Sequence, residues 1–423
     1  MIYYSSGSEK TVLRSDDLKR SLFTALKKLG RKRKVLVVPP DFTRIHSKAG
    51  ELTTYIYQYY KESLKDILPA LGTHTPMTDS ELGIMFKGIP KSLFRIHDWR
   101  KDIVTTGVVP GEFVSQITGG MVDFPWPAQV NRLIKDGGHD LILSVGQVVP
   151  HEVMGMAGYN KNLFVGTSGT EGINKSHFIG AVYGMERIMG KADNPVRQLL
   201  NYASSNFIKD LPVVYVHTVI GYNDSGELVT RGLYIGDDID VLSLAANLSL
   251  KVNFSVLDEP LKKAVVYLDP AEFKSTWLGN KSIYRTRMAM ADKGELIVLA
   301  PGLKEFGEDK GIDIYIRKYG YHGTPATLKA IKENKELQNN LSAAAHLIHG
   351  SSEGRFSITY CPGFLSREEI ESVNFNYADL KEMQKRYDPG KLKDGFNRLP
   401  DGEEIFYISN PALGLWALKE RLK

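Results

Sequence analysis

Short apolar runs that end in polar or glycine-rich loops place the strongest limit on how this chain can fold. Residues 34–38 form a β-branched run closed by Pro39 and Pro40, which predicts a buried strand. Apolar and aromatic residues three and four apart over 51–65 predict a helix, and residues 67–71 predict a second strand. A strand, a helix and a strand of these lengths form a βαβ unit, whose parallel strands direct both following loops to one edge of the sheet.

Further strands are expected along the whole chain. The apolar run 140–145 predicts a third strand, and it leads into a segment, 146–172, that is too rich in glycine for a helix interior. The other expected strands lie at 213–220, 228–235, 264–268, 295–299 and 356–360. The predicted fold class is therefore α/β, with two parallel-rich domains, the first of them Rossmann-like, and an active-site cleft between them.

The expected domain boundary lies where a second series of predicted strands and helices begins. Residues 1–258 are predicted to form the N-terminal cofactor-binding and catalytic domain, and residues 259–405 a C-terminal domain that closes on the substrate. Residues 406–423 are predicted to pack back on the N-terminal domain. A length of 423 residues fits this division, because domains contain roughly 100 to 200 residues each.

Composition excludes several classes of protein. The net charge of +5, from 54 basic and 49 acidic residues, is too small to predict nucleic-acid binding, although small anionic ligands stay possible. No segment reaches the ~20 apolar residues that a membrane helix needs, and the N-terminus has no signal-peptide pattern. We therefore expect a cytoplasmic protein with no membrane or nucleic-acid partner.

The single cysteine limits metal chemistry. Cys361 alone cannot form an intramolecular disulfide or a thiolate cluster. A soft metal in this protein would need sulfur ligands from a cofactor.

Charged and ionisable side chains follow the first three predicted strands. Because these strand ends should meet at one sheet edge, we expect one cluster there, made of Asp41, Arg44, His74, His151, Lys161 and His177. Each residue also has a structural interpretation, since Arg44 could simply pair with Asp41 and most histidines near strand ends catalyse nothing.

The spacing between His151 and Lys161 is the most specific part of this set. The string is His-x3-Gly-x2-Gly-x2-Lys, and His177 follows sixteen residues later. Gly155 and Gly158 would let the backbone approach a phosphate or a flat ring closely, or they would serve tight packing of the turn alone.

These motifs resemble the nickel-pincer lactate racemase family of 2-hydroxy-acid racemases and epimerases. The resemblance rests on Asp41-x-Thr43-Arg44, on Gly72-x-His74-x-Pro76, and on the 151–161 string with His177 at the family's spacing. It covers residues 34–190 well and the C-terminal part only loosely.

The resemblance implies a cofactor and a role for each motif. The cofactor would be a nickel-pincer nucleotide (nickel pyridinium bis-thiocarboxylate mononucleotide) tethered at Lys161, with His177 as a nickel ligand. Residues implied at the cofactor are Asp41, Thr43, Arg44, Gly155 and Gly158. His74 and His151 would be the catalytic acid–base pair, and Arg44 would hold the substrate carboxylate or the cofactor phosphate. Cofactor-biosynthesis enzymes would be partners.

Two departures from the family bear on the substrate. Phe42 stands where lactate-specific members usually have a histidine, and Arg285 and Met288 replace their carboxylate-binding glutamine and lysine. With Lys281 and Arg287, Arg285 forms a basic set that would bind substrate or would be only a solvated face. We therefore expect a sugar acid, an aldonate epimerised at C2, rather than lactate as the small-molecule 2-hydroxy acid.

Two other functions stay open. The first is a divalent-metal hydrolase or aldolase that would use His74, His151 and His177 as protein ligands. The second is a non-catalytic protein that would bind a nucleotide or a sugar acid on the same scaffold.

Overall fold

The computed structural model describes residues 1–223, 225–412 and 414–422. The chain divides into two compact units. Unit 1 comprises residues 1–179 and 188–253, and unit 2 comprises residues 180–187 and 254–423. In the described part of the chain no helix is both long and apolar enough to cross a membrane.

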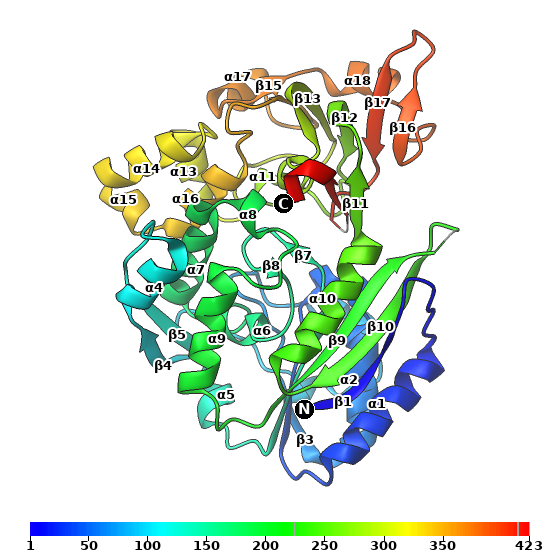
Figure 1. The fold of residues 1–423 in the computed structure, drawn as a ribbon, viewed down its shortest axis with the longest axis vertical. Coiled ribbons are helices and arrows are strands. Elements are labelled where there is room, and N and C mark those ends of the chain that lie inside the picture. The colour runs from blue at the N-terminus through cyan, green and yellow to red at the C-terminus, as the bar shows by residue number, and fades with distance from the viewer. Residues whose placement is uncertain (224, 413, 423) are drawn as a thin grey trace. The chain divides into compact units, whose positions relative to one another are not determined.

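Unit 1 is built on a six-stranded sheet (Figure 1). Its strands, in spatial order, are β1 (Ile2–Gly7), β10 (Leu228–Gly236), β9 (Val213–Tyr222), β6 (Leu141–Gln147), β2 (Val35–Val38) and β3 (Leu64–Ile67). The four strands β9, β6, β2 and β3 are parallel, whereas β1, β10 and β9 pair antiparallel.

Helices cover both faces of this sheet. The helices of unit 1 are α1 (Ser15–Leu29), α2 (Ala49–Tyr60), α3 (Asp79–Met85), α4 (Gly111–Thr118), α5 (Arg132–Asp136), α6 (Lys161–Phe164), α9 (Pro195–Phe207) and α10 (Ile239–Asn253). Two more, α7 (Thr170–Tyr183) and α8 (Met185–Ile188), run across the division between the units. Short 3-10 turns are η1 (Phe42–Ser47), η2 (Lys61–Ser63) and η3 (Lys91–Leu93).

The sheet has a hydrophobic core on each side, because successive residues of a strand point to opposite faces. Val214 and Val216 of β9 face the side covered by α1 and α2, and Tyr215 and Val219 face α10. Alternate residues of one strand therefore bury apolar surface on opposite sides of the sheet, which is why its central strands are buried along their whole length.

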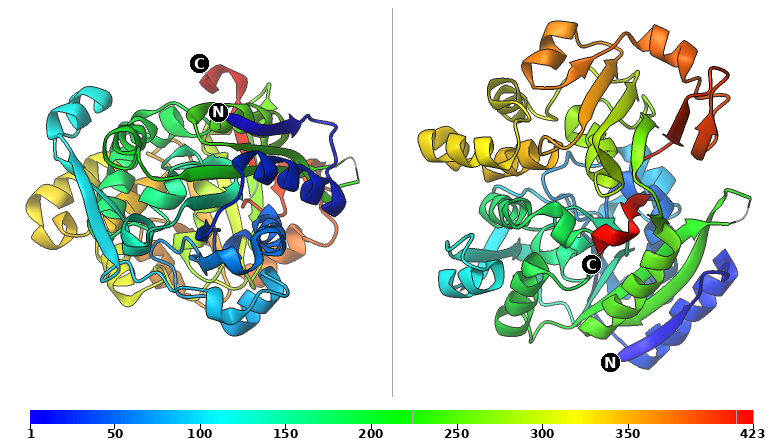
Figure 2. Two further views of the ribbon diagram at one scale, coloured as in Figure 1. Left: turned by 90° about the horizontal axis from the view of Figure 1, so that it is seen from below. Right: turned by 45° about the horizontal axis from the view of Figure 1, so that its top comes forward.

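Smaller two-stranded elements complete unit 1. They are the ribbon of β4 (Ile103–Val109) and β5 (Trp126–Asn131), and the hairpin of β7 (Pro150–His151) and β8 (Gly155–Met156). The ribbon packs against α9. Its strands, in cyan, can be followed in both views of Figure 2.

Unit 2 has its own parallel-rich sheet. In spatial order its strands are β15 (Asn376–Tyr377), β14 (Ser357–Pro362), β13 (Met290–Ala300), β12 (Leu261–Tyr267), β17 (Glu404–Ile408) and β16 (Gly395–Arg398). Only β16 pairs antiparallel among these described strands. A separate parallel pair joins β11 (Phe254–Leu257) to β18 (Leu415–Leu418).

The helices of unit 2 follow its strands in the usual alternation. They are α11 (Thr276–Gly279), α12 (Lys281–Thr286), α13 (Lys310–Tyr319), α14 (Thr324–Glu333), α15 (Lys335–Gln338), α16 (Leu341–His349), α17 (Arg367–Ser372) and α18 (Leu380–Arg386), with the 3-10 turn η4 (Lys419–Leu422) near the end. Two parallel-rich sheets with interleaved helices confirm the predicted α/β class.

The C-terminal segment falls in unit 2. There β17 pairs with β12, and β18 pairs with β11, whose residues lie inside the range 1–258 predicted for the N-terminal domain. Residues 180–187 also belong to unit 2, where Ala181 packs against Ala345 and Ile348. Strand pairing and apolar contacts, rather than position along the chain, place these two segments in unit 2.

The second predicted strand lies earlier than expected. Helix α2 ends at Tyr60 because Lys61 adopts a positive φ of 48°, and β3 then covers Leu64–Ile67 instead of residues 67–71. Pro69 has no N–H for a regular ladder, although the chain stays aligned and the Ala70 amide donates to the Pro39 carbonyl at 2.7 Å.

Candidate functional site

The first loop of the site begins where β2 ends. Asp41 is buried and caps η1, and its Oδ1 accepts hydrogen bonds from the backbone amide of Thr43 at 3.2 Å and from the Thr43 hydroxyl at 2.5 Å. Its other oxygen, Oδ2, lies 2.6 Å from Nδ1 of His74, which follows β3. The neighbouring strands β2 and β3 thus join their loops through an aspartate–histidine pair.

The charge state of Asp41 follows from these partners. Burial by itself raises the pKa of Asp41, but the hydrogen bond and charge of His74, the Thr43 hydroxyl and the charge of Arg44 together hold that pKa below its usual value. Since an ionised carboxylate only accepts hydrogen bonds, the proton between the pair lies on Nδ1 of His74. In the neutral form of His74 the lone pair therefore lies on Nε2, and 42% of the side chain is exposed.

His151 lies in the β7–β8 hairpin that follows β6. The residue is buried, and its Nδ1 accepts the backbone N–H groups of Val153 at 3.2 Å and Met154 at 3.4 Å. Burial lowers the pKa of His151 well below its usual value, and the positive charges of Lys161, Arg44 and His177 lower it further. The ring is therefore neutral at physiological pH.

Lys161 is the first residue of α6 and is half-buried. Burial, and next the charge of Arg44, lower the pKa of Lys161 to about 8, against the opposing charges of Glu152 and Asp41. At pH 7 about a tenth of its amine is therefore unprotonated, far more than for a lysine with an unshifted pKa, and this is the form that a nucleophilic lysine needs.

His177 lies inside α7, which begins at Thr170. Its Nδ1 is 2.8 Å from the carbonyl oxygen of Ile173, one turn back on the helix. Because a carbonyl can only accept, Nδ1 carries the proton and Nε2 carries the lone pair. Burial lowers the pKa of His177, so the ring stays neutral and its Nε2 is prepared to bind a metal ion.

The structure brings the predicted residues of unit 1 within electrostatic range of one another. Arg44 acts on Asp41, His151 and Lys161, and Lys161 acts on His177. No ion pair or side-chain hydrogen bond of Arg44 occurs among the described residues, so its interpretation as a mere partner of Asp41 has no geometric support.

The two glycines of the 151–161 string serve packing. Gly155 has φ of 71°, and a Cβ there would lie 1.9 Å from the Lys191 carbonyl oxygen. Gly158 has φ of 90°, and its Cβ would lie 3.0 Å from a methyl of Val148. Protein atoms therefore occupy the space that a side chain would need, and the packing interpretation accounts for both glycines.

Arg197 of α9 supports the same loop and was missed by the sequence analysis. Its guanidinium is buried and donates to the carbonyl oxygens of Met156 and Gly158 and to Oδ1 of Asn160, the residue before Lys161. The available signal is a charged residue on a helix face otherwise made of Val196, Leu200 and Ala203. A buried arginine that holds a loop needs such a set of acceptors.

The predicted basic set lies in unit 2. Arg285 and Arg287 are both buried, so this set is not a solvated face. Arg287 pairs with Glu186 at 2.8 Å and with Glu353 at 3.4 Å, which gives its guanidinium a structural role. Lys281 lies over the ring of Phe273 at 5.5 Å.

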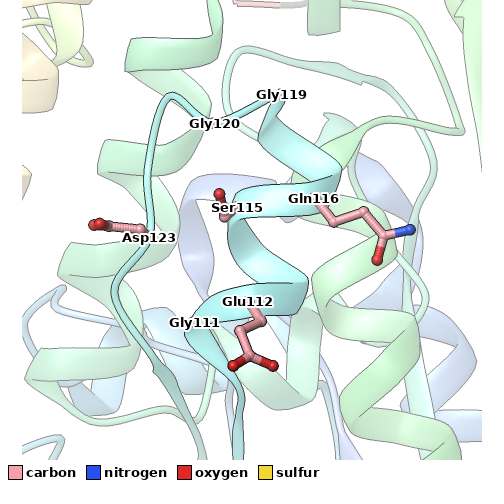
Figure 3. Close-up of a pocket in the computed structure, with 7 residues that line it drawn as sticks. All are labelled: Gly111, Glu112, Ser115, Gln116, Gly119, Gly120 and Asp123. Atoms are coloured by element: carbon pink, nitrogen blue, oxygen red, sulfur yellow. The ribbon is translucent and has the colours of Figure 1, made fainter.

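One hollow is separate from these residues. It measures about 630 Å³ and is lined by Gly111, Glu112, Ser115, Gln116, Gly119, Gly120 and Asp123, on α4 and the turn after it (Figure 3). None of the candidate residues lines it. Across the described residues, no group of three or more His, Cys, Asp or Glu side chains could hold a metal ion, so the hydrolase alternative gains no support from this geometry.

Comparison with known proteins assigns a family to this site. Residues 18–188 match the model of the lactate racemase N-terminal domain, a range that contains every candidate residue of unit 1. This part of the chain is a lactate racemase N-terminal domain by that match. No curated protein matches the chain.

Two solved structures resemble the chain over both units. A protein of Thermotoga maritima is 25% identical with a TM-score of 0.80, covering 96% of this chain and 98% of that one. The lactate racemase apoprotein of Thermoanaerobacterium thermosaccharolyticum is 17% identical with a TM-score of 0.71, covering 98% and 94%. At that identity the second match shows a shared fold.

Gly155→Ala tests the packing of the loop. We expect it to destabilise the protein by about 3 kcal/mol or more, because the new methyl meets the Lys191 carbonyl and an L residue is strained at positive φ. Gly119→Ala is the matched control, since Gly119 has φ of 65° but open space around it, and should cost only about 1 kcal/mol. Urea unfolding measures both, and equal losses would contradict the packing interpretation.

The pH dependence of Lys161 acetylation tests whether the pKa of this lysine is lowered. Acetylation of Lys161, followed by peptide mass spectrometry, should have its midpoint near pH 8. A lysine in a short peptide titrates at about 10.4. Arg44→Gln should raise the Lys161 midpoint by removing a nearby positive charge, whereas Arg20→Gln at an exposed position should leave it unchanged. A midpoint near 10 in the unsubstituted protein would contradict this account.

Proposed function

We propose that this protein is a 2-hydroxy-acid racemase or epimerase that inverts C2 of its substrate by reversible hydride transfer to a nickel-pincer nucleotide. The observation that carries this proposal is the pair of Lys161, whose pKa is lowered to about 8, and His177, whose Nε2 carries a lone pair. The match to the lactate racemase N-terminal domain supports an isomerase of this type.

The residues of unit 1 fit such a cofactor. Lys161 would hold it through a thioamide, and His177 would bind nickel through Nε2. Nickel also suits soft sulfur ligands, which the cofactor must bring, because Cys361 is buried and belongs to unit 2. When bound, the cofactor supplies the nickel and the ring carbon that accepts hydride.

The cofactor's nucleotide part would be held by the first loop. Asp41, Thr43 and Arg44 follow β2, and Arg44 offers a guanidinium that suits a phosphate or a carboxylate. Gly155 and Gly158 would contribute only through the shape of the loop that carries Lys161, since protein atoms pack against both.

His74 has the features of a general base. The Asp41 carboxylate at 2.6 Å fixes its tautomer and would stabilise the imidazolium that forms when Nε2 takes the substrate hydroxyl proton. Loss of that proton promotes departure of the C2 hydrogen as hydride, giving a transient 2-keto acid. His151 is the second member of the proposed acid–base pair.

The proposed substrate is a sugar acid, an aldonate, rather than lactate. The proposal rests on the sequence differences at Phe42, Arg285 and Met288. Arg44, Arg285 and Arg287 are the arginines that we propose for substrate binding, and the carboxylates of Glu186 and Glu353 already pair with Arg287.

The proposal also implies partners and a location. Enzymes that make and load the cofactor must act on this protein before it turns over. Its one cysteine, Cys361, forms no disulfide and is buried, which is consistent with a reducing compartment, and we propose that the protein works in the cytoplasm.

Expression with the cofactor-biosynthesis enzymes tests this function. We expect an intact-mass increase of a few hundred daltons that maps to Lys161, about one nickel per chain, and loss of the C2 stereocentre in an aldonate panel but not in lactate or malate. Lys161→Arg should abolish the adduct. His177→Ala should retain the adduct and lower nickel content at least tenfold, on the order of the effect of removing a metal ligand.

Controls separate loading from chemistry. A known family member loaded by the same accessory enzymes shows that they are competent. An unmodified, metal-free chain that epimerises an aldonate at full rate would contradict the proposal, as would a chain that stays without adduct and nickel beside that loaded control.

A further inference from the structure

The first turn of α7 is held by two buried side chains of β5. The indole Nε1–H of Trp126 donates to the carbonyl oxygen of Gly172 at 2.9 Å. Oε1 of Gln129 accepts the backbone N–H of Gly172 at 3.1 Å. The first N–H groups of a helix have no partner within it, and Gln129 supplies one from outside. One strand of the β4–β5 ribbon therefore binds both backbone polar groups of a residue at the start of α7.

A buried histidine outside the candidate cluster holds the residues before this turn. Nε2 of His97 lies 3.0 Å from the carbonyl oxygen of Ser168, and its Nδ1 lies 2.9 Å from Nδ2 of Asn131. Oδ1 of Asn131 already accepts the Leu133 N–H at 2.9 Å, which fixes Nδ2 as the donor to His97. The proton of the His97 ring thus lies on Nε2, where it bonds the Ser168 carbonyl. His97 links the end of β5 to the segment that leads into α7.

Glycine allows this segment to approach the ribbon closely. A Cβ at Gly169 would lie 2.4 Å from Cδ1 of Ile103. A Cβ at Gly172 would lie 2.6 Å from Oγ of Ser168. Neither position has room for a side chain. Part of the glycine-rich segment therefore serves to seat the start of α7 on the ribbon.

The same backbone carries the hydrogen bond that orients His177. The Ile173 carbonyl, one residue after Gly172, accepts from Nδ1 of His177 at 2.8 Å and from the Ser176 hydroxyl at 2.9 Å. The Ile173 N–H is itself held by the Gly169 carbonyl at 3.1 Å. The direction of the Ile173 carbonyl, and with it the orientation of the His177 ring, depends on how the ribbon holds its neighbour Gly172.

We propose that Trp126, Gln129 and His97, the clamp residues, are positioning residues for His177. They hold the start of α7 on the ribbon and so fix the direction in which His177 presents Nε2 to the nickel of the cofactor. The inference rests on the proposed function for the role of His177 as a nickel ligand. The last turn of α7 belongs to unit 2, so the ribbon contacts anchor the ligand-bearing part of the helix within unit 1.

Nuclear magnetic resonance of the cofactor-free protein tests this positioning directly. Long-range ¹H–¹⁵N spectra of protein labelled at the histidine nitrogens report the His177 ring, and the signals lost in His177→Gln assign it. Gln129→Met removes the acceptor for the Gly172 N–H at similar side-chain size, and Trp126→Phe removes the indole donor. We expect the His177 signals to shift and broaden in both variants, because the hydrogen bond to Ile173 loosens.

Thr118→Val is the matched control. Thr118 is buried in α4, where its hydroxyl donates to the Val114 carbonyl at 2.8 Å and accepts the Val122 N–H at 3.3 Å. Its loss leaves one backbone N–H without a partner, as Gln129→Met does, but away from α7. The His177 signals should stay unchanged. Gln129→Glu keeps an oxygen acceptor for the Gly172 amide, so its spectrum should lie closer to that of the unsubstituted protein than the spectrum of Gln129→Met.

Nickel release from the loaded protein tests the consequence. Loss of a group that orients a metal ligand typically lowers metal affinity about 10- to 100-fold. At equal adduct content, a chelator should therefore remove nickel at least about tenfold faster from the Trp126→Phe/Gln129→Met double variant than from the unsubstituted protein. Thr118→Val should release nickel at the unsubstituted rate. His97→Gln, whose amide can still donate to the Ser168 carbonyl, should release nickel more slowly than His97→Leu.

The outcomes separate this proposal from the proposed function. Unchanged His177 signals in both Trp126→Phe and Gln129→Met would overturn the positioning role, as would equal nickel release from the double variant and Thr118→Val. If the unsubstituted protein takes up no cofactor and no nickel beside a competent loaded control, the proposed function fails. The spectra of the cofactor-free protein still decide whether the clamp residues orient His177.

Discussion

Parallel pairing of β3, β2 and β6 is the constraint on which the site depends. Val37 pairs with Ile67, and Val38 pairs with Ser144, so β2 and β3 end side by side and β6 continues to Gln147 in the same direction. The carboxyl ends of parallel strands lie at one edge of the sheet, so the loops that follow these strands all begin at that edge. A helix or an antiparallel hairpin in place of one strand would move a histidine to the opposite edge.

The chemistry of the site then depends on the hydrogen-bonding groups that lie next to each histidine ring. His74, His151 and His177 are the same side chain, yet a carboxylate, a pair of amides and a carbonyl at Nδ1 give them different roles. This control requires the backbone to stay in place. Arg197, buried under the loop that carries Lys161, supplies that rigidity by donating to several of its acceptors.

The sequence predicts which residues form the site, but not the tautomer of each histidine ring. Asp41, His74 and His151 could be predicted because each polar side chain directly follows an apolar run, a pattern that survives even where the strand boundary was wrong, as at Leu64–Ile67. The partners of His151 and His177 could not be predicted, since they are backbone atoms whose identity leaves no trace in the residue type, whereas the partner of His74 is the side chain of Asp41. The same holds for residues 406–423, whose pairing with distant strands depends on tertiary contacts rather than on local pattern.

The close packing at Gly155 has an evolutionary consequence. With the Lys191 carbonyl in the place of any Cβ, this position tolerates no larger residue unless the neighbouring turn moves as well. Under the proposed function, this position is therefore a poor place for natural variation to change the substrate preference. New preferences should arise at positions that the loop does not constrain, such as Phe42.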